Sequence, residues 1–261
     1  MNHLNDILLQ ISIFLVGLCI GSFLNVCICR IPEGRSVVKP GSACMKCGHR
    51  LTWWENIPIV SFIILRAKCS SCGARISFQY PVVEALTGVT ILLLWRKFNL
   101  TPDFFIYSCF VATLIIITFI DLEHQLIPDV LSLPMIALGL ISSFFLADLK
   151  WYDSLIGILL GGGVLYLVAG GYYLLTHKEG MGGGDIKLLA MIGAFLGWKA
   201  IPLVVFISAG LGSVTGIVLI LMQKAERRTA IPYGPFLALA AMITIFYGNE
   251  LTAWYLNLSQ G

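Results

Sequence analysis

Charged residues are scarce in this chain. Asp, Glu, Lys and Arg make up 12% of its 261 residues, whereas soluble domains contain about 25%. Hydrophobic residues make up 58%. This balance excludes an ordinary water-soluble domain and predicts an all-α polytopic membrane protein, with the lipid bilayer as its surroundings. The formal net charge of +3 is too small to indicate a nucleic-acid partner, and none is expected.

Other common signals are missing as well. No basic stretch precedes the first apolar segment and no small-residue cleavage site follows it, so we expect that segment to be retained as a span. No G-x-G-x-x-G motif follows a strand, which excludes a Rossmann-type cofactor site. The chain also contains no tandem repeat and no low-complexity tract.

Long apolar segments are the dominant feature that is present. A membrane helix needs roughly 20 such residues, and we predict about eight of these helices, at 8–28, 82–98, 104–122, 130–147, 154–175, 187–198, 201–222 and 232–255. The sequence does not show whether the short segment 187–198 crosses completely. Another apolar stretch, 57–65, is too short to cross. It is either the small core of a soluble loop or an interfacial segment.

Lys and Arg are distributed unevenly between the predicted loops. Most of the 17 Lys and Arg residues fall on one side of the membrane, in loops 29–81, 123–129, 176–186 and 223–231. Lys187 lies at the inner edge of the following span, and the exceptions are Arg96, Lys97, Lys150 and Lys199. Because basic residues accumulate in cytoplasmic loops, we expect both termini outside. The predicted parts are a first helix (1–28), a cytoplasmic region (29–81) and a membrane domain (82–261).

Four of the eight cysteines form two C-x2-C pairs. They are Cys44, Cys47, Cys69 and Cys72. Two such pairs are typical of tetrahedral zinc bound by four thiolates, which leaves no open position and makes the metal structural. Two disulfides are the alternative, and a reducing cytoplasm argues against them. We therefore predict a small cytoplasmic zinc-knuckle loop domain.

Two aspartates are predicted at the same depth of the membrane. Asp185 follows glycines 182–184 at the start of one span, and Asp121 ends another span on the same side. Two close carboxylates share a proton, as in aspartic proteases. Because helix N-termini favour anions and C-termini disfavour them, we expect Asp185 to be mainly the base and Asp121 to hold the proton.

Less specific interpretations of these aspartates are open. Each of them, taken alone, is also common as a loop charge or as a helix cap. Other candidates for the partner of Asp185 lie in the same loop as Asp121, namely Glu123, His124 and Asp129.

Several motifs, present in order from about residue 15 to about residue 240, resemble bacterial type IV prepilin peptidases. Gly182-Gly183-Gly184-Asp185 matches the G-x-G-D signature of intramembrane aspartyl proteases. The other matching motifs are the two C-x2-C pairs, Gly21-Ser22-Phe23-Leu24-Asn25-Val26, Arg30-Ile31-Pro32, Asn56-Ile57-Pro58, Tyr80-Pro81-Val82-Val83-Glu84, Asp121 with Ile127-Pro128-Asp129, and Ile231-Pro232-Tyr233-Gly234-Pro235-Phe236.

This resemblance implies a bifunctional enzyme of the bacterial cytoplasmic (inner) membrane. It would cleave the leader of prepilins and pseudopilins at the cytoplasmic face and then methylate the new N-terminal amine with S-adenosylmethionine. Asp121 and Asp185 would form the catalytic pair, and the four cysteines would bind zinc. Candidate substrate-binding residues are Gly182, Gly184, Lys187 and Glu84. The glycines would admit substrate backbone, Lys187 would contact an acidic substrate residue, and Glu84 would bind or deprotonate the amine.

Two other classes of protein are alternatives. A proton-coupled transporter also uses paired intramembrane carboxylates, but its sites lie near the midplane on broken helices within repeated halves. The absence of a repeat and the placement of both aspartates at one face count against it. A zinc-knuckle scaffold without chemistry would not need the pair of aspartates.

Overall fold

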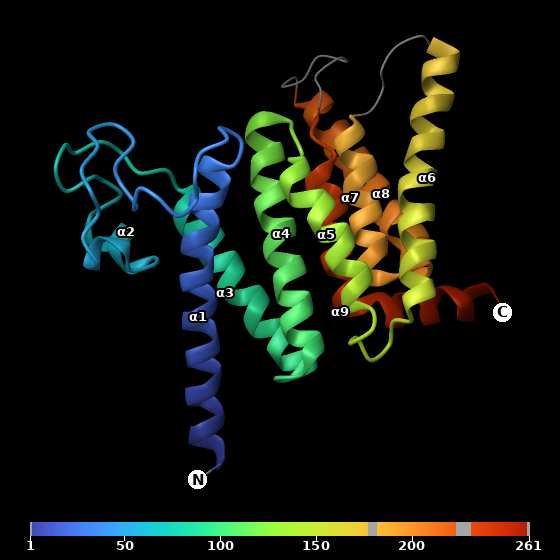
Figure 1. Cartoon of the computed structure of the whole chain (residues 1–261), viewed down its shortest axis with the longest axis horizontal. Coiled ribbons are helices and arrows are strands. Elements are labelled where there is room, and N and C mark those ends of the chain that lie inside the picture. The colour runs from blue at the N-terminus through green and yellow to red at the C-terminus, as the bar shows by residue number, and fades with distance from the viewer. Residues whose placement is uncertain (1, 177–181, 223–230, 260–261) are drawn as a thin grey trace. The chain divides into compact units, whose positions relative to one another are not determined.

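The computed structural model describes residues 2–176, 182–222 and 231–259. Two compact units make up the chain, Met1–Ile116 and Ile117–Gly261. The described residues form helices, together with two isolated backbone bridges and no strand. The predicted all-α class is confirmed, and each of the eight predicted apolar segments contains a helix, although the helix in 130–147 ends at Ser142 (Figure 1).

The long helices are α1 (Asn2–Arg30), α3 (Gln79–Phe98), α4 (Pro102–His124), α5 (Asp129–Ser142), α6 (Trp151–Thr176), α7 (Gly183–Leu196), α8 (Ile201–Leu221) and α9 (Gly234–Ser259). The short ones are α2 (Val60–Ile64) and the 3-10 helices η1 (Trp54–Asn56) and η2 (Trp198–Ala200). Among the described residues, five helices are long and apolar enough to cross a bilayer, and they are α1, α4, α6, α8 with η2, and α9.

In the first unit, α1 packs against α3 through glycines (Figure 1). A Cβ atom added to Gly17 would lie 2.8 Å from the Cα of Gly88, and one added to Gly21 would lie 2.7 Å from the Cα of Glu84. These distances are too short for any side chain, so the two backbones approach each other closely. This crossing places the start of α3, with Glu84, directly against α1.

The apolar stretch 57–65 contains the short helix α2. No residue of α2 is buried, and Ile63 and Ile64 are 67% and 64% exposed. Phe62 and Leu65 of the same stretch are half-buried and line a cavity of the loop, so the interpretation of the stretch as a small core of the loop stays a prediction. Exposed apolar side chains fit the other interpretation, an interfacial segment.

In the second unit, α7 lies against α5, α6, α8 and α9 (Figure 1). All of its residues from Leu188 to Phe195 are buried. Its 14 residues rise about 21 Å at 1.5 Å per residue, less than the roughly 30 Å of a hydrocarbon core. The short segment predicted at 187–198 is thus the central, protein-covered helix of this unit.

The helices α6 and α7 touch through their backbones. A Cβ atom on Gly193 would collide with the carbonyl oxygen of Gly157, and one on Gly157 would collide with the carbonyl oxygen of Gly193. The glycines that the sequence shows inside α6 therefore serve helix packing at this position. Gly163, in the same helix, has no atom within 4 Å of the corresponding point.

Gly193→Ala is expected to separate α6 from α7 and to destabilise the protein by about 1–3 kcal/mol, the usual penalty for overpacking. The thermal unfolding midpoint in detergent measures the effect. Gly163→Ala is the matched control and should leave the midpoint unchanged or raise it, since alanine favours helices by up to about 1 kcal/mol over glycine. Equal midpoints for both variants would contradict the packing role.

Candidate active site and metal centre

The two C-x2-C pairs have the same local geometry. In each pair the residue after the second cysteine, Gly48 or Gly73, has a positive φ, 72° and 68°, a conformation that glycine adopts without strain. The N–H of Gly48 donates to the carbonyl of Cys44 at 2.9 Å, and the N–H of Gly73 donates to that of Cys69 at 3.0 Å. Each turn therefore directs its two thiols to the same side.

The four thiols of these turns come together at one point. The Sγ atoms of Cys44 and Cys72 are 3.9 Å apart, as are those of Cys47 and Cys69, and all four lie within 4.8 Å of one another. A tetrahedral Zn–S4 site with bonds of about 2.3 Å has sulfur–sulfur distances of about 3.8 Å. All four cysteines are free thiols rather than disulfides. The donor set thus fits a structural metal ion.

The thiols of this cluster differ in their tendency to ionise. Although the backbone N–H of His49 lowers the pKa of the Cys47 thiol, desolvation and hydrogen bonds to the other thiols raise it to about 11. The backbone N–H groups of Cys47 and Lys46 lower the pKa of the Cys44 thiol to about 6. A thiolate is the form that binds metal, so Cys44 is prepared for coordination at neutral pH.

A carboxylate that the sequence did not single out joins the two turns. Glu55 is 6% exposed and accepts a hydrogen bond from the Ser70 hydroxyl, inside the second C-x2-C pair. Thr52 donates its N–H at 2.7 Å and its hydroxyl at 2.8 Å, and His49 Nε2 lies 3.3 Å away. The Ser70 bond, followed by those from Thr52, lowers the pKa of Glu55 to about 2. Glu55 therefore stabilises this loop as an anion at neutral pH, and that contribution is lost progressively as the pH falls from about 4.5 through about 2.

In the second unit, Asp121 lies close to the end of α4 and is 5% exposed. Its Oδ2 atom accepts a hydrogen bond of 3.0 Å from the N–H of Gly234, the first residue of α9. A helix N-terminus offers unpaired N–H groups and a positive dipole end. Asp121 is thus held at the start of a helix that begins 113 residues later.

Asp185 is the third residue of α7 and is half-buried. The N-cap of this helix is Gly182, and no side chain caps it, so the interpretation of Asp185 as a helix cap is wrong. Asp121 lies within electrostatic range of Asp185, so the two predicted partners occupy the same region of this unit. The other candidates have partners of their own: Glu123 and His124 pair with each other, and Asp129 binds Lys187.

Ile127 contacts both glycines that flank the aspartates. A Cβ atom on Gly184 would lie 2.9 Å from the Cβ of Ile127, and one on Gly234 would lie 3.3 Å from its Cδ1 and 2.6 Å from Oδ2 of Asp121. Glycine is required at both positions because a larger residue would push Ile127 or Asp121 away. Two glycines and one isoleucine therefore fix the spacing of the aspartate pair.

Gly234→Ala is expected to displace the Asp121 carboxylate and, if the pair is catalytic as predicted, to lower the rate of peptide cleavage by about 100-fold, the usual effect of a misplacement near 1 Å. The rate of substrate cleavage by purified protein measures it. Gly183→Ala is the control, because a Cβ there meets no atom within 4 Å, and it should keep the rate within about threefold. Similar losses in both variants would show that the contact with Asp121 is not the cause.

Two further residues lie near the pair. The hydroxyl groups of Tyr233 and Ser208 are 2.7 Å apart, and Ser208 is fully buried. The charge of Asp185 also acts on Tyr233, so this tyrosine borders the pair. Tyr233 belongs to a motif visible in the sequence, whereas no local pattern marks Ser208.

The remaining candidate residues have protein contacts of their own. Lys187 binds both carboxylate oxygens of Asp129, at 2.7 and 2.8 Å, and so links α7 to α5. Gly182 is exposed at the start of α7. Glu84, in the first unit, is 6% exposed and accepts the N–H of Ile59 at 2.7 Å. The structure does not test substrate contacts for these residues, which stay predictions.

The fold and this site define an intramembrane hydrolase of the aspartic type, with a cysteine-rich accessory loop. Residues 15–98 match the family model described as the bacterial peptidase A24 N-terminal domain, and residues 108–217 match the type IV leader peptidase family. The chain belongs to the type IV leader peptidase family.

Full-length relatives support this membership. Three proteins named prepilin leader peptidase/N-methyltransferase are similar to the chain. The protein from Pseudomonas aeruginosa is 39% identical, covering 94% of this chain and 92% of the relative. That from Stutzerimonas stutzeri is 37% identical, covering 98% and 96%, and that from Aeromonas salmonicida is 38% identical, covering 94% and 93%. No solved structure gives a significant match.

Proposed function

We propose that this protein is a membrane aspartic endopeptidase that removes the leader peptide of type IV prepilins and pseudopilins at the cytoplasmic face. It then methylates the new N-terminal amine. One observation carries the proposal. Asp121 accepts a hydrogen bond from the N–H of Gly234 and lies within electrostatic range of Asp185, and the three residues lie at the ends of three helices. Membership of the leader peptidase family supports the substrate class.

Asp121 and Asp185 are the proposed catalytic residues, and they divide the work. One carboxylate must be ionised to take a proton from water, and the other must be protonated to polarise the scissile carbonyl. The Gly234 N–H donates to Asp121, and a hydrogen bond to the charged form favours that form. We therefore assign the charge to Asp121 and the shared proton to Asp185, the reverse of the arrangement expected from helix ends alone.

The peptide is cleaved in two steps at this pair. Asp121 accepts a proton as the water oxygen attacks the carbonyl carbon, and Asp185 donates its proton to the carbonyl oxygen. The tetrahedral intermediate then collapses: the C–N bond breaks, the departing amine receives the proton from Asp121, and one hydroxyl of the intermediate returns its proton to Asp185 as the carboxyl group forms. The glycines beside the pair leave room for an extended substrate backbone.

The placement of the pair favours a peptidase over a proton-coupled transporter. Asp121 is three residues from the end of α4, and Asp185 is in the first turn of α7. Transporter carboxylates lie near the midplane. A site at helix ends is instead within reach of a substrate whose cleaved bond lies at the membrane surface.

S-adenosylmethionine is the proposed methyl donor and zinc the proposed structural metal. Zinc would be held by Cys44, Cys47, Cys69 and Cys72, whose spacing fits a tetrahedral site. It would supply the cross-link that so small a loop needs. The donor supplies an electrophilic methyl group to the amine that cleavage releases.

Cleavage and methylation are tested with purified protein and a prepilin in detergent. Mass spectrometry should show loss of the leader and, with S-adenosylmethionine, an N-methylated new N-terminus. Asp121→Ala and Asp185→Ala should each leave the prepilin intact. Leader removal by both variants would overturn the assignment of the pair.

The orientation is tested in intact cells with a membrane-impermeant thiol reagent. Lys150→Cys lies on the predicted outer side and should be labelled. Glu123→Cys lies beside Asp121 and should be labelled only after the cells are opened. The opposite pattern would place the aspartate pair at the outer face.

A further inference from the structure

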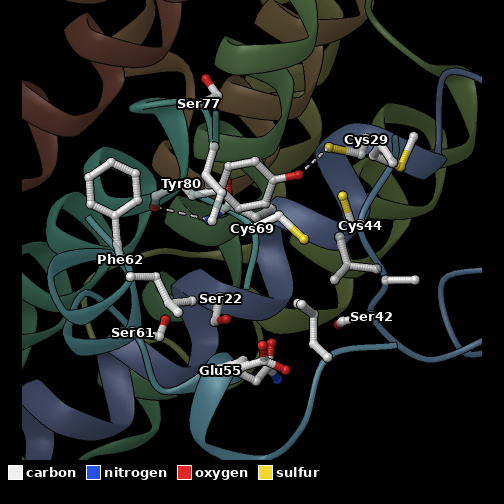
Figure 2. A pocket seen from close by; sticks show the side chains of 18 of the residues that line it. Ser22, Cys29, Ser42, Cys44, Glu55, Ser61, Phe62, Cys69, Ser77 and Tyr80 are labelled. Atoms are coloured by element: carbon white, nitrogen blue, oxygen red, sulfur yellow. Dashed lines mark hydrogen bonds between the residues drawn. The ribbon is translucent and has the colours of Figure 1, made fainter. Parts of the chain in front are cut away.

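The first unit contains a cavity of about 370 Å³ between α1, α3 and the cysteine loop (Figure 2). Pockets for small molecules usually measure about 300–1,000 Å³. The cavity is much larger than a metal ion and reaches from Cys44 and Cys69 to Asn25 and Glu84. Its size fits a nucleoside that carries an amino-acid tail.

Several charged groups at the cavity are already used within the protein. Glu55 is satisfied by Ser70, Thr52 and His49. Arg30 donates to the carbonyls of Ser36 and Gly41, and Arg35 pairs with Glu33. These groups therefore hold the loop together and are not available to a ligand.

Glu84 differs from them because it is a buried carboxylate without a cation. It is 6% exposed, and the Ile59 N–H and the Ser22 hydroxyl bind it. No ion pair to Glu84 exists among the described residues. A carboxylate accepts up to about four hydrogen bonds, and a buried charge without a counter-charge is costly. A cationic ligand in this cavity would offset that cost.

Other lining groups complement the rest of such a ligand. The Nδ2 atom of Asn25 donates to the carbonyl of Tyr80 at 3.1 Å, and the Oδ1 atom of this cavity-lining residue is a hydrogen-bond acceptor. Arg75 lines the cavity without an ion pair to any described residue. Figure 2 shows the Tyr80 hydroxyl directed at the Cys29 thiol, 3.6 Å away. The cavity thus offers an acceptor pair for a cation, a guanidinium for a carboxylate, and an aromatic ring.

We propose that this cavity binds S-adenosylmethionine, with its sulfonium near Glu84 and Asn25 and its carboxylate at Arg75. The inference rests on the proposed methyltransferase function and gives it a location. It assigns the donor to the first unit, apart from the aspartate pair in the second. Cys29, a thiol outside the zinc set, lines the site and reports its occupancy.

Binding is measured in the full-length, zinc-loaded protein by alkylation of Cys29 with N-ethylmaleimide. Cys19→Ala, Cys27→Ala and Cys109→Ala leave Cys29 as the one thiol outside the zinc set. Saturating S-adenosylmethionine should slow alkylation at least about fivefold. It should also bind at least about tenfold more tightly than S-adenosylhomocysteine, which lacks the positive charge.

Matched variants test the assigned contacts. Glu84→Gln should abolish the preference for S-adenosylmethionine over S-adenosylhomocysteine. Arg75→Ala should weaken the binding of both compounds about tenfold. Lys68→Ala removes an exposed positive charge that does not line the cavity, and it should leave protection unchanged. Retained zinc and leader cleavage show that each variant is folded, and Arg75→Ala provides the test if Glu84→Gln does not fold.

The outcomes separate this inference from the proposed function. If the protein methylates a cleaved prepilin while Cys29 stays fully reactive at saturating donor, the cavity assignment is wrong and the function stands. If the donor protects Cys29 but no methylation occurs, the site stands and the methyltransferase proposal is wrong. Protection by a prepilin peptide and not by the donor would also overturn the assignment.

Discussion

Asp185→Asn is expected to reduce the rate of leader removal by at least about 1,000-fold, the scale seen when a residue that acts directly in proton transfer is replaced. Asparagine keeps the shape of the side chain but cannot hold the shared proton as a carboxylic acid. Asp121→Asn should lose activity similarly, because the amide cannot take a proton from water. Single-turnover cleavage of a prepilin, followed by mass spectrometry, measures both.

Asp129→Asn is the control for this loss. Asp129 is exposed and its partner is the partly exposed Lys187, so the variant loses only a surface ion pair worth about 0–1 kcal/mol. Cleavage within about threefold of the unmodified rate is expected. A 1,000-fold loss in Asp129→Asn together with full activity in Asp185→Asn would move the catalytic role to the loop.

The second large effect concerns the cysteine cluster. Cys69→Ser is expected to lower bound zinc from about one ion per chain to below about 0.1 ion per chain. A four-thiolate site loses most of its affinity for zinc when one of its ligands is removed. The loop should then unfold locally, since its short helix α2 has no buried residue. Metal analysis by mass spectrometry and limited proteolysis of 29–81 measure these changes.

Cys109→Ser is the matched control, because Cys109 lies in α4 outside the cluster. Its zinc content and its proteolysis pattern should match those of the unmodified protein. Full zinc content in Cys69→Ser would contradict the four-thiolate assignment. A zinc-free loop that resists proteolysis would instead show that Glu55 and its hydrogen bonds suffice to fold it.

The aspartate pair shows where sequence patterns stop being sufficient. Charge distribution between loops predicted that Asp121 and Asp185 lie at one depth, and in the structure Asp121 is within electrostatic range of Asp185. The expected division of the proton between them depended on the ends of their own helices. Our proposal of the opposite division rests on the Gly234 N–H, which comes from a third helix. Nothing near Asp121 in the sequence reveals that contact.

The sequence by itself determined the membrane class, the helical segments and the clustering of thiols. These features follow from composition, from the length of apolar runs and from spacings of a few residues. All of these can be read along the chain without knowing how distant segments pack. Only the tertiary structure decided three features: the Gly234 N–H as the partner of Asp121, the hydrogen bonds through which Glu55 joins the two C-x2-C turns, and the cavity beside Glu84. Each depends on groups that are far apart in the chain, and their contact is set by how helices and loops pack.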